Sequence, residues 1–360
     1  MNIKEATRSF EAWLGKQVVL VRQDLAQKHR NMAADPFTFL RATFYRWAQI
    51  WPSVCSELAA APEVLAVGDL HIENFGTWRD AEGRLIWGIN DFDEAHPLPY
   101  TNDLVRLATS ANLAIWSSHM ATNLRQVCEA ILEGYGKGLE KGGKPFILEE
   151  KHAELRRMAL NKLRDPVRYW GRLDALRTYK GPVPPEVIEA LEGMMPAAGI
   201  RQRIVHRLAG EGSLGRQRFL ALANWRGARI AREAKSMAPS ACVWAKGTGA
   251  SRILYSEILK RAVRCEDPFV QIRGRWLLRR LAPDCSRIPL PSLPSERDER
   301  ALLRAMGRET ANIHLGTADA LAAIHRDFSR RKDSWLLDAA GAMTEAMGQD
   351  FDAWRRQSRA

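Results

Sequence analysis

A short apolar run that stops at a glycine constrains the fold of this chain more than any other feature. Val64-Leu65-Ala66-Val67 has the length and β-branched content of a strand, and it ends at Gly68. Phe75–Arg79 and Leu85–Ile89 flank the turn-prone Asp80-Ala81-Glu82-Gly83, a pattern that predicts a β-hairpin. Because a hairpin carries the chain out and back, residues just before and just after it are expected to meet at one edge of a sheet.

The residues at that edge carry oxygen atoms suited to a hard cation. Gly68-Asp69-Leu70-His71-Ile72-Glu73-Asn74 precedes the hairpin, and Asn90-Asp91-Phe92-Asp93 follows it. We therefore expect Asp69, Asn74 and Asp91 to converge, with Asp93 as a further candidate metal ligand. Carboxylate and amide oxygens are ligands that Mg²⁺ prefers. The five-residue step from Asp69 to Asn74 matches the kinase catalytic loop, where the Asp orients a hydroxyl and the Asn holds metal.

Helical spacing of apolar residues covers most of the first 180 residues. Residues 1–60 are predicted to be mainly helical, with Asp35-Pro36 as a helix start. A second helical pattern runs from Asp103 to about Gly142, and Asp103 is a candidate N-cap. Residues 147–176 are predicted to add further helix, rich in charge and exposed on one face.

A breaker cluster, Gly181-Pro182-Val183-Pro184-Pro185, marks a change of pattern. After it we predict strands at Arg203–Leu208, Arg218–Ala223, Ala228–Ala234 and Trp276–Leu281, a helix at Ser251–Val263, and a second break at Pro289, Pro291 and Pro294. This order predicts an α+β fold. Its expected parts are a helical lobe with the catalytic loop and the hairpin (1–180), a small β-rich nucleotide-binding lobe (181–290), and C-terminal helices that pack on the helical lobe (291–360).

A glycine-rich segment, Gly210-Glu211-Gly212-Ser213-Leu214-Gly215, lies between two predicted strands. A dinucleotide-binding loop of this spacing opens into a helix, whereas a kinase loop joins two strands and covers phosphates. The strand pattern that follows favours the kinase-like loop, with Gly210, Gly212, Ser213 and Gly215 at the nucleotide. A structural hairpin with convenient glycines is the alternative.

A small lobe of the kinase type also needs a cation on its third strand, paired with a glutamate from a helix. Arg232 and Lys235 are both candidates, and we favour Lys235 because a compact ammonium is the usual choice. Glu257, inside the expected helix, is the candidate partner. The alternative for Glu257 is an ordinary solvated carboxylate on a helix face.

The run GDLHIEN, followed by INDFDEAHPLPYTNDLVRLA, resembles the aminoglycoside phosphotransferase and choline kinase branch of the protein-kinase-like superfamily. The resemblance implies Asp69 as catalytic base, with Asn74 and Asp91 as metal ligands. It also implies that Asp103 is a buried carboxylate that braces the catalytic loop. The same segments, with Pro36–Arg41, are similar to the bacterial family called domain of unknown function 2252, whose name assigns no activity.

The order of these elements differs from that of ordinary kinases. There the glycine-rich loop precedes the catalytic loop, whereas here residues 210–215 follow Asp69 in the chain. Chain ends can be relocated at surface loops of compact domains. We therefore expect a circularly permuted, two-lobe, kinase-like arrangement; the alternative is that the glycine-rich segment is unrelated.

The composition indicates which classes of binding partner are favoured. The chain has 54 Lys and Arg against 42 Asp and Glu, a formal net charge of +12, which favours a negatively charged partner such as a nucleotide and an acidic or phosphorylated substrate. Nucleic acid is a less favoured alternative, because no basic–aromatic repeat or zinc-finger spacing accompanies the charge. With no signal-peptide pattern, no apolar stretch long enough to span a bilayer and five scattered cysteines, we expect a cytoplasmic protein without membrane association.

These patterns predict an ATP- and Mg²⁺-dependent phosphotransferase that acts on a hydroxyl of an unidentified, small-molecule acceptor. One alternative is a non-catalytic, kinase-like module that binds nucleotide. Another is a metal-dependent phosphoesterase, because Asp69-x-His71 resembles the opening of dinuclear phosphoesterase sites. For His71 itself, a hydrogen bond that orients the loop is favoured over metal ligation.

Overall fold

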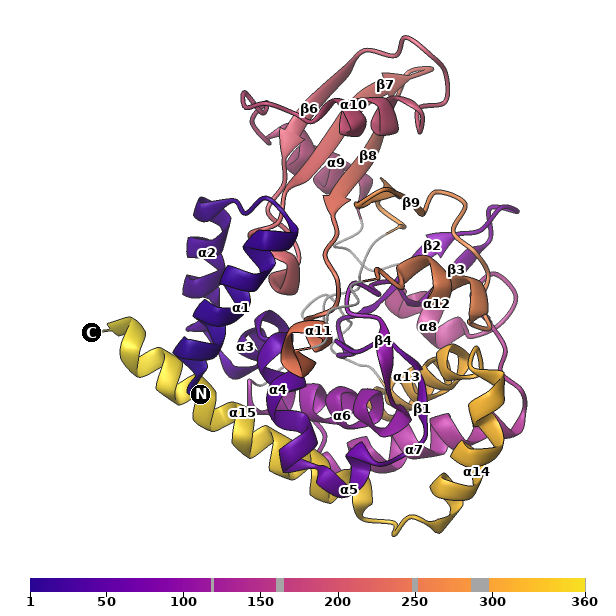
Figure 1. The fold of residues 1–360 in the computed structure, drawn as a ribbon. Coiled ribbons are helices and arrows are strands. Elements are labelled where there is room, and N and C mark those ends of the chain that lie inside the picture. Colours follow the sequence, from indigo (N-terminus) through magenta and orange to yellow (C-terminus); the bar gives the residue numbers. More distant parts are fainter. Residues whose placement is uncertain (118–119, 160–164, 248–251, 286–297, 360) are drawn as a thin grey trace.

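Helices form a large body, from which a small antiparallel sheet projects (Figure 1). The computed structural model describes residues 1–117, 120–159, 165–247, 252–285 and 298–359. Within these residues the fold is mixed α+β, with small antiparallel sheets and many helices, as the sequence predicts at this level. Among the same residues, no helix is both long enough and apolar enough to cross a membrane.

The body is built from both ends of the chain. Its helices are α1 (Ile3–Gln17), α2 (Arg22–Met32), α3 (Pro36–Ala42), α4 (Phe44–Val54), α5 (Ser56–Ala59), α6 (Tyr100–Trp116), α7 (Leu124–Glu140), α8 (Ala153–Ala159), α13 (Glu299–His314), α14 (Leu321–Arg330) and α15 (Trp335–Arg359), with a 3₁₀ turn, η4, at Ala318–Ala320. Two small sheets join them: β1 (Glu63–Ala66) with β4 (His96–Pro99), and β2 (Phe75–Arg79) with β3 (Leu85–Ile89) and β5 (Phe146–Ile147).

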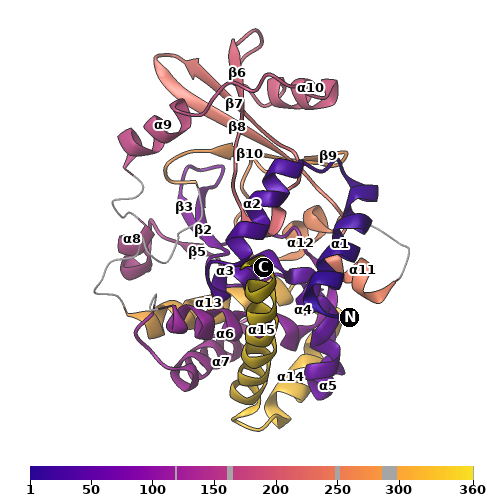
Figure 2. The same cartoon turned by 90° about the vertical axis from the view of Figure 1, so that its left-hand side faces the viewer.

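Helix α6 lies at the centre of the body, and every residue from Tyr100 to Ala114 is buried. Figure 2 shows α15 running along the outside of this body, with α6 and α7 behind it. A helix that is buried all round must satisfy its polar side chains inside the protein. The polar residues of α6 therefore have to find partners on neighbouring elements, and the loop before the hairpin supplies several of them.

Helices α7 and α13 approach each other unusually closely. A Cβ added to Gly307 of α13 would lie 2.2 Å from the backbone oxygen of Ile131, and one added to Gly134 of α7 would lie 2.0 Å from that of Arg304. Two glycines thus face the opposite backbone in a reciprocal contact. Because the neighbours at both positions are main-chain atoms, the contact leaves no room for a methyl group.

The projecting part is a five-stranded antiparallel sheet in the order β6-β7-β8-β10-β9. Its strands are β6 (Gln202–His206), β7 (Arg218–Trp225), β8 (Ala228–Ser236), β9 (Gln271–Arg273) and β10 (Trp276–Leu281); the associated helices are α9 (Pro166–Asp174), α10 (Pro185–Glu192), α11 (Ala241–Lys246) and α12 (Tyr255–Arg261), and η2 (Glu211–Ser213) is a 3₁₀ turn. Helix α10 packs on one face of the sheet through Val187 and Leu191, and α9 reaches the other through Leu173. Helices α11 and α12 instead join the core of the helical body.

Local sequence predicted many of these elements. The hairpin strands β2 and β3 and the strand β10 have the predicted bounds, and Asp35 caps α3 as expected. Two local predictions are wrong. Asp103 is not an N-cap but lies in the first turn of α6, whose N-cap is Pro99, and the helix expected from Asp103 to Gly142 is two helices. The predicted break at Pro289, Pro291 and Pro294, and with it the boundary at residue 290, lies outside the described residues.

The close contact of α7 and α13 gives a first prediction. Gly307→Ala should lower the free energy of unfolding by about 1–3 kcal/mol, because overpacking against a backbone forces the helices apart. Gly341→Ala is the matched control: Gly341 lies in α15 with no neighbouring atom within 4 Å of its would-be Cβ, and alanine there should raise stability by up to about 1 kcal/mol. Guanidinium denaturation of the three proteins measures both effects. Equal losses in the two variants would contradict the packing argument.

Candidate active site

The loop that follows β1 is fixed by a carboxylate from α6. The backbone N–H of Val67 donates to Oδ2 of Asp103 (2.7 Å), and that of Gly68 donates to Oδ1 (3.0 Å). The imidazole of His314, on α13, lies 3.1 Å from the same Oδ2. Gly68 has φ +79°, and a Cβ there would lie 2.4 Å from the backbone oxygen of Glu94. Only glycine fits this turn, which places Asp69 at the end of the strand.

Arg106, one helical turn after Asp103, holds the side chain of Asp69. Its Nε donates to Oδ1 of Asp69 (2.8 Å), and its Nη2 donates to the backbone oxygen of Leu40 (3.0 Å). The guanidinium is fully buried and lies over the rings of Phe44 and Trp47, 5.0 and 4.8 Å from their centroids. The side chain of Asp69 is 17% exposed, so this buried cation orients a carboxylate that solvent still reaches.

Asn74 lies beside Asp69 and turns its amide nitrogen toward the loop. Its Nδ2 donates to the backbone oxygen of Asp69 (2.6 Å). Its Oδ1 is buried and has no hydrogen-bond partner among the described residues. His71 occupies the loop between them, and its Nδ1 accepts a hydrogen bond from the backbone N–H of Glu73 (3.2 Å). The imidazole thus contributes to the shape of the loop.

Lys235 reaches from β8 of the small sheet to the segment after the hairpin. Its Nζ forms an ion pair with Oδ2 of Asp93 and lies 3.6 Å from Oδ1 of Asp91. Burial lowers the pKa of Lys235 to about 8, although Asp93 opposes this shift. Burial by itself would raise the pKa of Asp93, but the charges of Lys235 and Arg216 outweigh it and leave that pKa below its usual value. Oδ1 of Asp93 is buried and has no hydrogen-bond partner among the described residues.

The structure does not bring the other two small-lobe candidates to this position. Arg232 lies on β8 but donates to the backbone oxygens of Met194 and Ala231, and its guanidinium lies over the ring of Phe269. Because successive side chains of a strand alternate between faces, Arg232 and Lys235 point to opposite sides of the sheet. Glu257, on α12, forms ion pairs with Arg252 and Arg261. Among the described residues, the carboxylates that contact Lys235 are those of Asp91 and Asp93.

The glycine-rich segment lies directly over Asp69. A Cβ on Gly212 would lie 3.4 Å from Oδ2 of Asp69 and 3.2 Å from the backbone oxygen of Arg41. Gly210 and Gly215 have φ +78° and +95°, values that favour glycine, and they flank the 3₁₀ turn η2. Ser213 accepts a hydrogen bond at Oγ from Arg218 (2.9 Å).

Helix α2 holds this segment in place. Nζ of Lys28 donates to the backbone oxygen of Gly212 (3.3 Å), and Nδ2 of Asn31 donates to Oε2 of Glu211 (2.9 Å). The backbone N–H of Val21 donates to the backbone oxygen of Gly215 (2.8 Å). Burial lowers the pKa of Lys28 to about 8. The N-terminal helices therefore connect the helical body to the small sheet at the glycine-rich segment.

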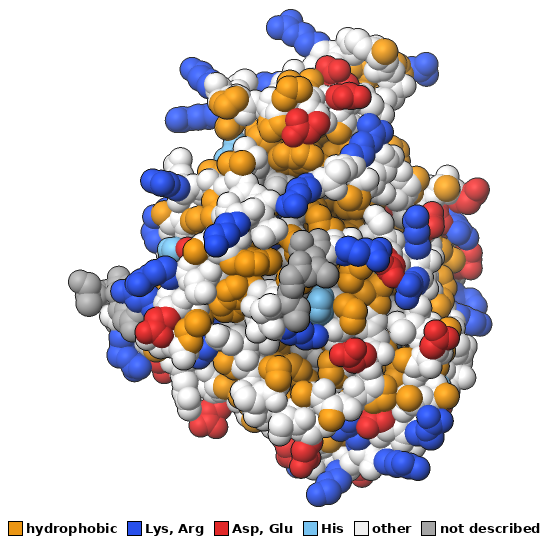
Figure 3. All heavy atoms as spheres, viewed as in Figure 1, with side chains coloured by type: hydrophobic (Ala, Val, Ile, Leu, Met, Phe, Trp, Pro, Cys, Tyr) orange, Lys and Arg blue, Asp and Glu red, His pale blue; other side chains and the backbone are white. Residues whose placement is uncertain are grey.

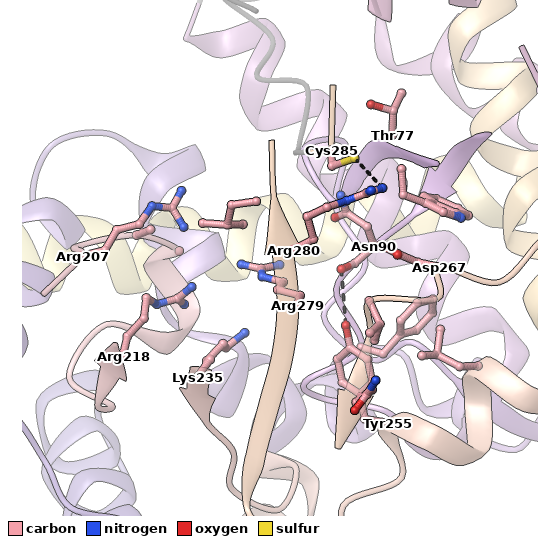
Figure 4. Close-up of a pocket in the computed structure, with 18 of the residues that line it drawn as sticks. Thr77, Asn90, Arg207, Arg218, Lys235, Tyr255, Asp267, Arg279, Arg280 and Cys285 are labelled. Carbon is pink, nitrogen blue, oxygen red and sulfur yellow. Dashed lines mark hydrogen bonds between the residues drawn. The ribbon is translucent and has the colours of Figure 1, made fainter. Parts of the chain in front are cut away.

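A large cavity and a much smaller space adjoin each other at the candidate site. A cavity of about 650 Å³ lies between the small sheet, the hairpin and α12, and Lys235, Asn90, Phe92 and Gly210 are among its lining residues (Figure 4). A much smaller space of about 20 Å³ is lined by residues that include Asp69, Asn74, Asp91 and Asp93. Arg41 and Gly210 line both. The larger cavity therefore leads toward the carboxylate cluster, while the glycine-rich segment leaves little room above Asp69.

The donor atoms fit a hard cation. The Oδ1 atoms of Asn74 and Asp93 are buried oxygens without a hydrogen-bond partner among the described residues, and Asp91 lies with them around the small space. Oxygen donors of this kind suit Mg²⁺, which also keeps waters or substrate phosphates among its ligands. Within the described ranges, no group of three or more His, Cys, Asp or Glu is placed to hold a metal ion. A donor set for Mg²⁺ at this position would include the amide oxygen of Asn74.

Sequence reasoning missed several residues that hold this site from other parts of the chain. Arg106 is one, and Arg216 is another: it is buried beside Asp93 and Glu94, at 3.6 and 3.4 Å. Glu309, on α13, accepts from the backbone N–H of Ile89 (3.2 Å) through Oε1 and from Nδ2 of Asn312 (2.8 Å) through Oε2. The resemblance points to NDLVRLA, which contains Arg106, but nothing local connects Arg216 or Glu309 to the loop.

A comparison with known families supports one of the two resemblances noted in the sequence. A family model described as an uncharacterized protein conserved in bacteria (DUF2252) matches residues 20–168. The matched region contains the Asp69 loop, the hairpin, Asp91 and α6, and it ends before the five-stranded sheet. No curated protein and no solved structure matches the chain.

Glu309 gives a pH-dependent prediction. Burial raises its pKa to about 7, so between about pH 4.5 and 7 the unfolded chain loses a proton that the folded protein keeps. Stability from this group is therefore present below that range and lost as the pH rises through it. The free energy of unfolding of the wild type, relative to Glu309→Gln, should fall by about 3 kcal/mol from pH 4.5 to pH 7. Urea denaturation of both proteins measures it, and a difference independent of pH would contradict it.

Proposed function

We propose that the chain is a kinase-like phosphotransferase that uses Mg²⁺ and ATP and acts on a hydroxyl of a small molecule. The observation that carries the proposal is the meeting of Lys235 with Asp91 and Asp93. A cation from a strand of the small sheet reaches a carboxylate pair of the helical body, near the Oδ1 atom of Asn74, which has no hydrogen-bond partner in the described part of the chain. Phosphoryl transfer needs this combination of a cation, metal-binding oxygens and an orienting carboxylate more than it needs covalent chemistry.

The order of the sheet supports the assignment of the small lobe. In kinases the phosphate-binding lysine is on the third strand and the glycine-rich loop covers the phosphates. Here the glycine-rich segment joins β6 to β7, and Lys235 lies on β8, the next strand in both sequence and sheet order. A two-lobe, circularly permuted kinase-like arrangement accounts for this order together with the position of Asp69 in the chain.

Each side chain then has a distinct role. Asp69, held by Arg106, accepts the proton of the acceptor hydroxyl, and Asp103 fixes the loop that carries it. Lys235 neutralises phosphate charge in the cavity, which at about 650 Å³ lies within the range of about 300–1,000 Å³ usual for ligand sites. Bound Mg²⁺ would supply further charge neutralisation, held by Asn74 and Asp91 with Asp93.

A non-catalytic nucleotide-binding module is the second candidate, and one observation favours it. The space above Asp69 is only about 20 Å³, and Gly212 lies against the carboxylate. Turnover distinguishes the two, because a binding module does not require Asp69 as a base. For the phosphoesterase alternative, Nδ1 of His71 accepts a backbone hydrogen bond, which leaves that nitrogen occupied.

The nucleotide assignment is tested by thermal melting with Mg–ATP. A ligand that binds the folded state raises its stability by RT ln(1 + [L]/Kd), about 2.7 kcal/mol at one hundred times Kd. The wild type should show an upward shift that needs Mg²⁺, and Asp91→Asn should lose most of it. Asp319→Asn, at an exposed carboxylate of η4, is the control and should keep the shift. No shift in the wild type with several millimolar nucleotide would contradict the proposal.

The role of Asp69 is tested by turnover. Asp69→Asn should lower the rate of ADP release, measured over a panel of hydroxyl acceptors, by about 10²–10⁴-fold, because the amide cannot accept the proton. Its melting shift with Mg–ATP should remain, since the proposal assigns Asp69 as the base and gives the metal to Asn74, Asp91 and Asp93. If Asp69→Asn released ADP as fast as the wild type, Asp69 would not be the base. If the wild type bound Mg–ATP and no acceptor accelerated ADP release, the binding-module alternative would be favoured.

A further inference from the structure

Three arginines gather on the wall of the cavity around one buried glutamate. Nη1 of Arg207 donates to Oε2 of Glu233 (2.7 Å), while Arg218 and Arg279 donate to Oε1 (2.8 Å each). All three arginines line the cavity, whereas Glu233 is fully buried and does not. Figure 4 shows the head groups of Arg207, Arg218, Arg279 and Lys235 pointing toward the same space. We call Arg207, Arg218 and Arg279 the arginine triad.

The single carboxylate of Glu233 cannot accept hydrogen bonds from all the N–H groups of the triad. Three guanidinium groups carry about fifteen N–H donors, whereas a carboxylate offers about four lone-pair sites. Burial opposes the ionisation of Glu233, but the three cations outweigh it and hold its pKa well below the usual value. The cluster therefore keeps three positive charges against one negative charge. Glu233 fixes the direction of the guanidinium groups without neutralising them.

The rest of the cavity does not supply the missing negative charge. Among the described residues that line it, nine are Lys or Arg and three are Asp or Glu, and Glu73 is already paired with Arg41. The space-filling view shows Lys and Arg spread over the outer surface as well, on the sheet and on the body (Figure 3). The triad differs from those surface cations because its side chains are held in place and largely removed from water, where an anion is bound more strongly.

The triad lies next to Lys235 on the same wall of the cavity. In the sheet register Arg218 faces Lys235 across β7 and β8, and Glu233 faces Arg279 across β8 and β10. Glu233 and Lys235 are two residues apart on one strand, so they share a face and lie about 7 Å from each other. The cavity wall thus presents two cationic positions side by side. Lys235 has the carboxylates of Asp91 and Asp93 next to it, whereas the carboxylate that forms ion pairs with the triad among the described residues is that of Glu233.

We propose that the arginine triad binds a phosphate group of the hydroxyl acceptor, so that the substrate is a phosphorylated small molecule. This inference rests on the proposed function, in which the nucleotide phosphates occupy the position of Lys235. Arginine forks match the oxygens of a phosphate, and the excess charge of the cluster fits a dianion better than a carboxylate. Ser213, bonded to Arg218, and Gly210 connect the triad to the space above Asp69, where the acceptor hydroxyl has to lie.

Inorganic phosphate is the probe for this position. At constant ionic strength, set with sodium chloride, millimolar phosphate should raise the melting temperature of the wild type, and it should do so equally when Mg–ATP is saturating. Arg207→Gln should weaken the phosphate effect by about tenfold or more, since it removes a charged hydrogen-bond donor. Arg207 is the best position to change because its side chain is 29% exposed, so folding should tolerate the loss.

Arg226→Gln is the matched control. It removes the same charge from the same sheet, at the turn between β7 and β8, where the side chain lies over Trp225 and does not line the cavity. This variant should respond to phosphate as the wild type does. Acetate distinguishes the chemistry: a shift with phosphate and none with acetate supports a phosphorylated acceptor, and equal shifts overturn that assignment in favour of a carboxylate.

The remaining outcomes separate this inference from the proposed function. A phosphate shift that survives Arg207→Gln, or is lost equally in Arg226→Gln, overturns the triad as the anion position. Competition between phosphate and Mg–ATP means that the triad binds the nucleotide itself and overturns the acceptor assignment. A wild type that responds to phosphate and never to Mg–ATP retains the anion position, while the proposed function and the acceptor assignment fail together.

Discussion

The buried charges of α6 are the constraint on which the candidate site depends. Asp103 and Arg106 lie one turn apart in the fully buried part of α6, Tyr100 to Ala114, so both must be satisfied inside the protein. Asp103 accepts hydrogen bonds from the backbone N–H groups of Val67 and Gly68, and Arg106 donates to the carboxylate of Asp69. Three consecutive residues of one loop are therefore fixed by one helix. Removing Asp69 would leave Arg106 as an uncompensated buried charge, and removing Asp103 would leave two backbone N–H groups without their acceptor. These contacts hold the loop, and with it the side chain of Asp69, in one place.

Buried charged groups also connect the helical body to the small sheet. Lys235 with Asp93, and Arg216 with Glu94, join β8 and the end of the glycine-rich segment to the residues after the hairpin. The backbone N–H of Ala241 adds a hydrogen bond to Oε2 of Glu94 (2.6 Å). Glu94 is buried at this connection, and burial raises the pKa of its carboxyl to about 7. Charges so placed interact strongly with each other and with any ligand that enters between them.

The parts of this arrangement that local sequence determines were predictable. The turn residues at 80–83 and the alternation around them fix the hairpin, and the hairpin alone brings Asp91 near Asp69 and Asn74. Contacts between distant segments were not predictable in the same way. Arg216 and Glu309 reach the site from segments more than 120 residues from Asp91, and no short-range pattern encodes such pairs. Glu257 was predicted as the partner of the cation because it lies in a helix. Membership of a helix does not determine where a side chain points, and the carboxylate of Glu257 pairs with Arg252 and Arg261 instead.

The two spaces of the site differ in size, and this difference bears on how an acceptor could reach Asp69. The cavity is large enough for a nucleotide-sized ligand, whereas Gly212 lies against Asp69 and leaves almost no room for an acceptor. Under the proposed function, an acceptor larger than water would therefore need residues 210–215 to move before its hydroxyl reached Asp69. Among the described residues, hydrogen bonds from Val21, Lys28 and Asn31 connect this segment to α2 and the residue before it. Because each such bond contributes only about 1 kcal/mol net, a ligand that contacts the segment through Arg218 and Ser213 can supply enough binding free energy to displace it. Under the proposed function, the loop that covers the phosphates would then also control access to the base.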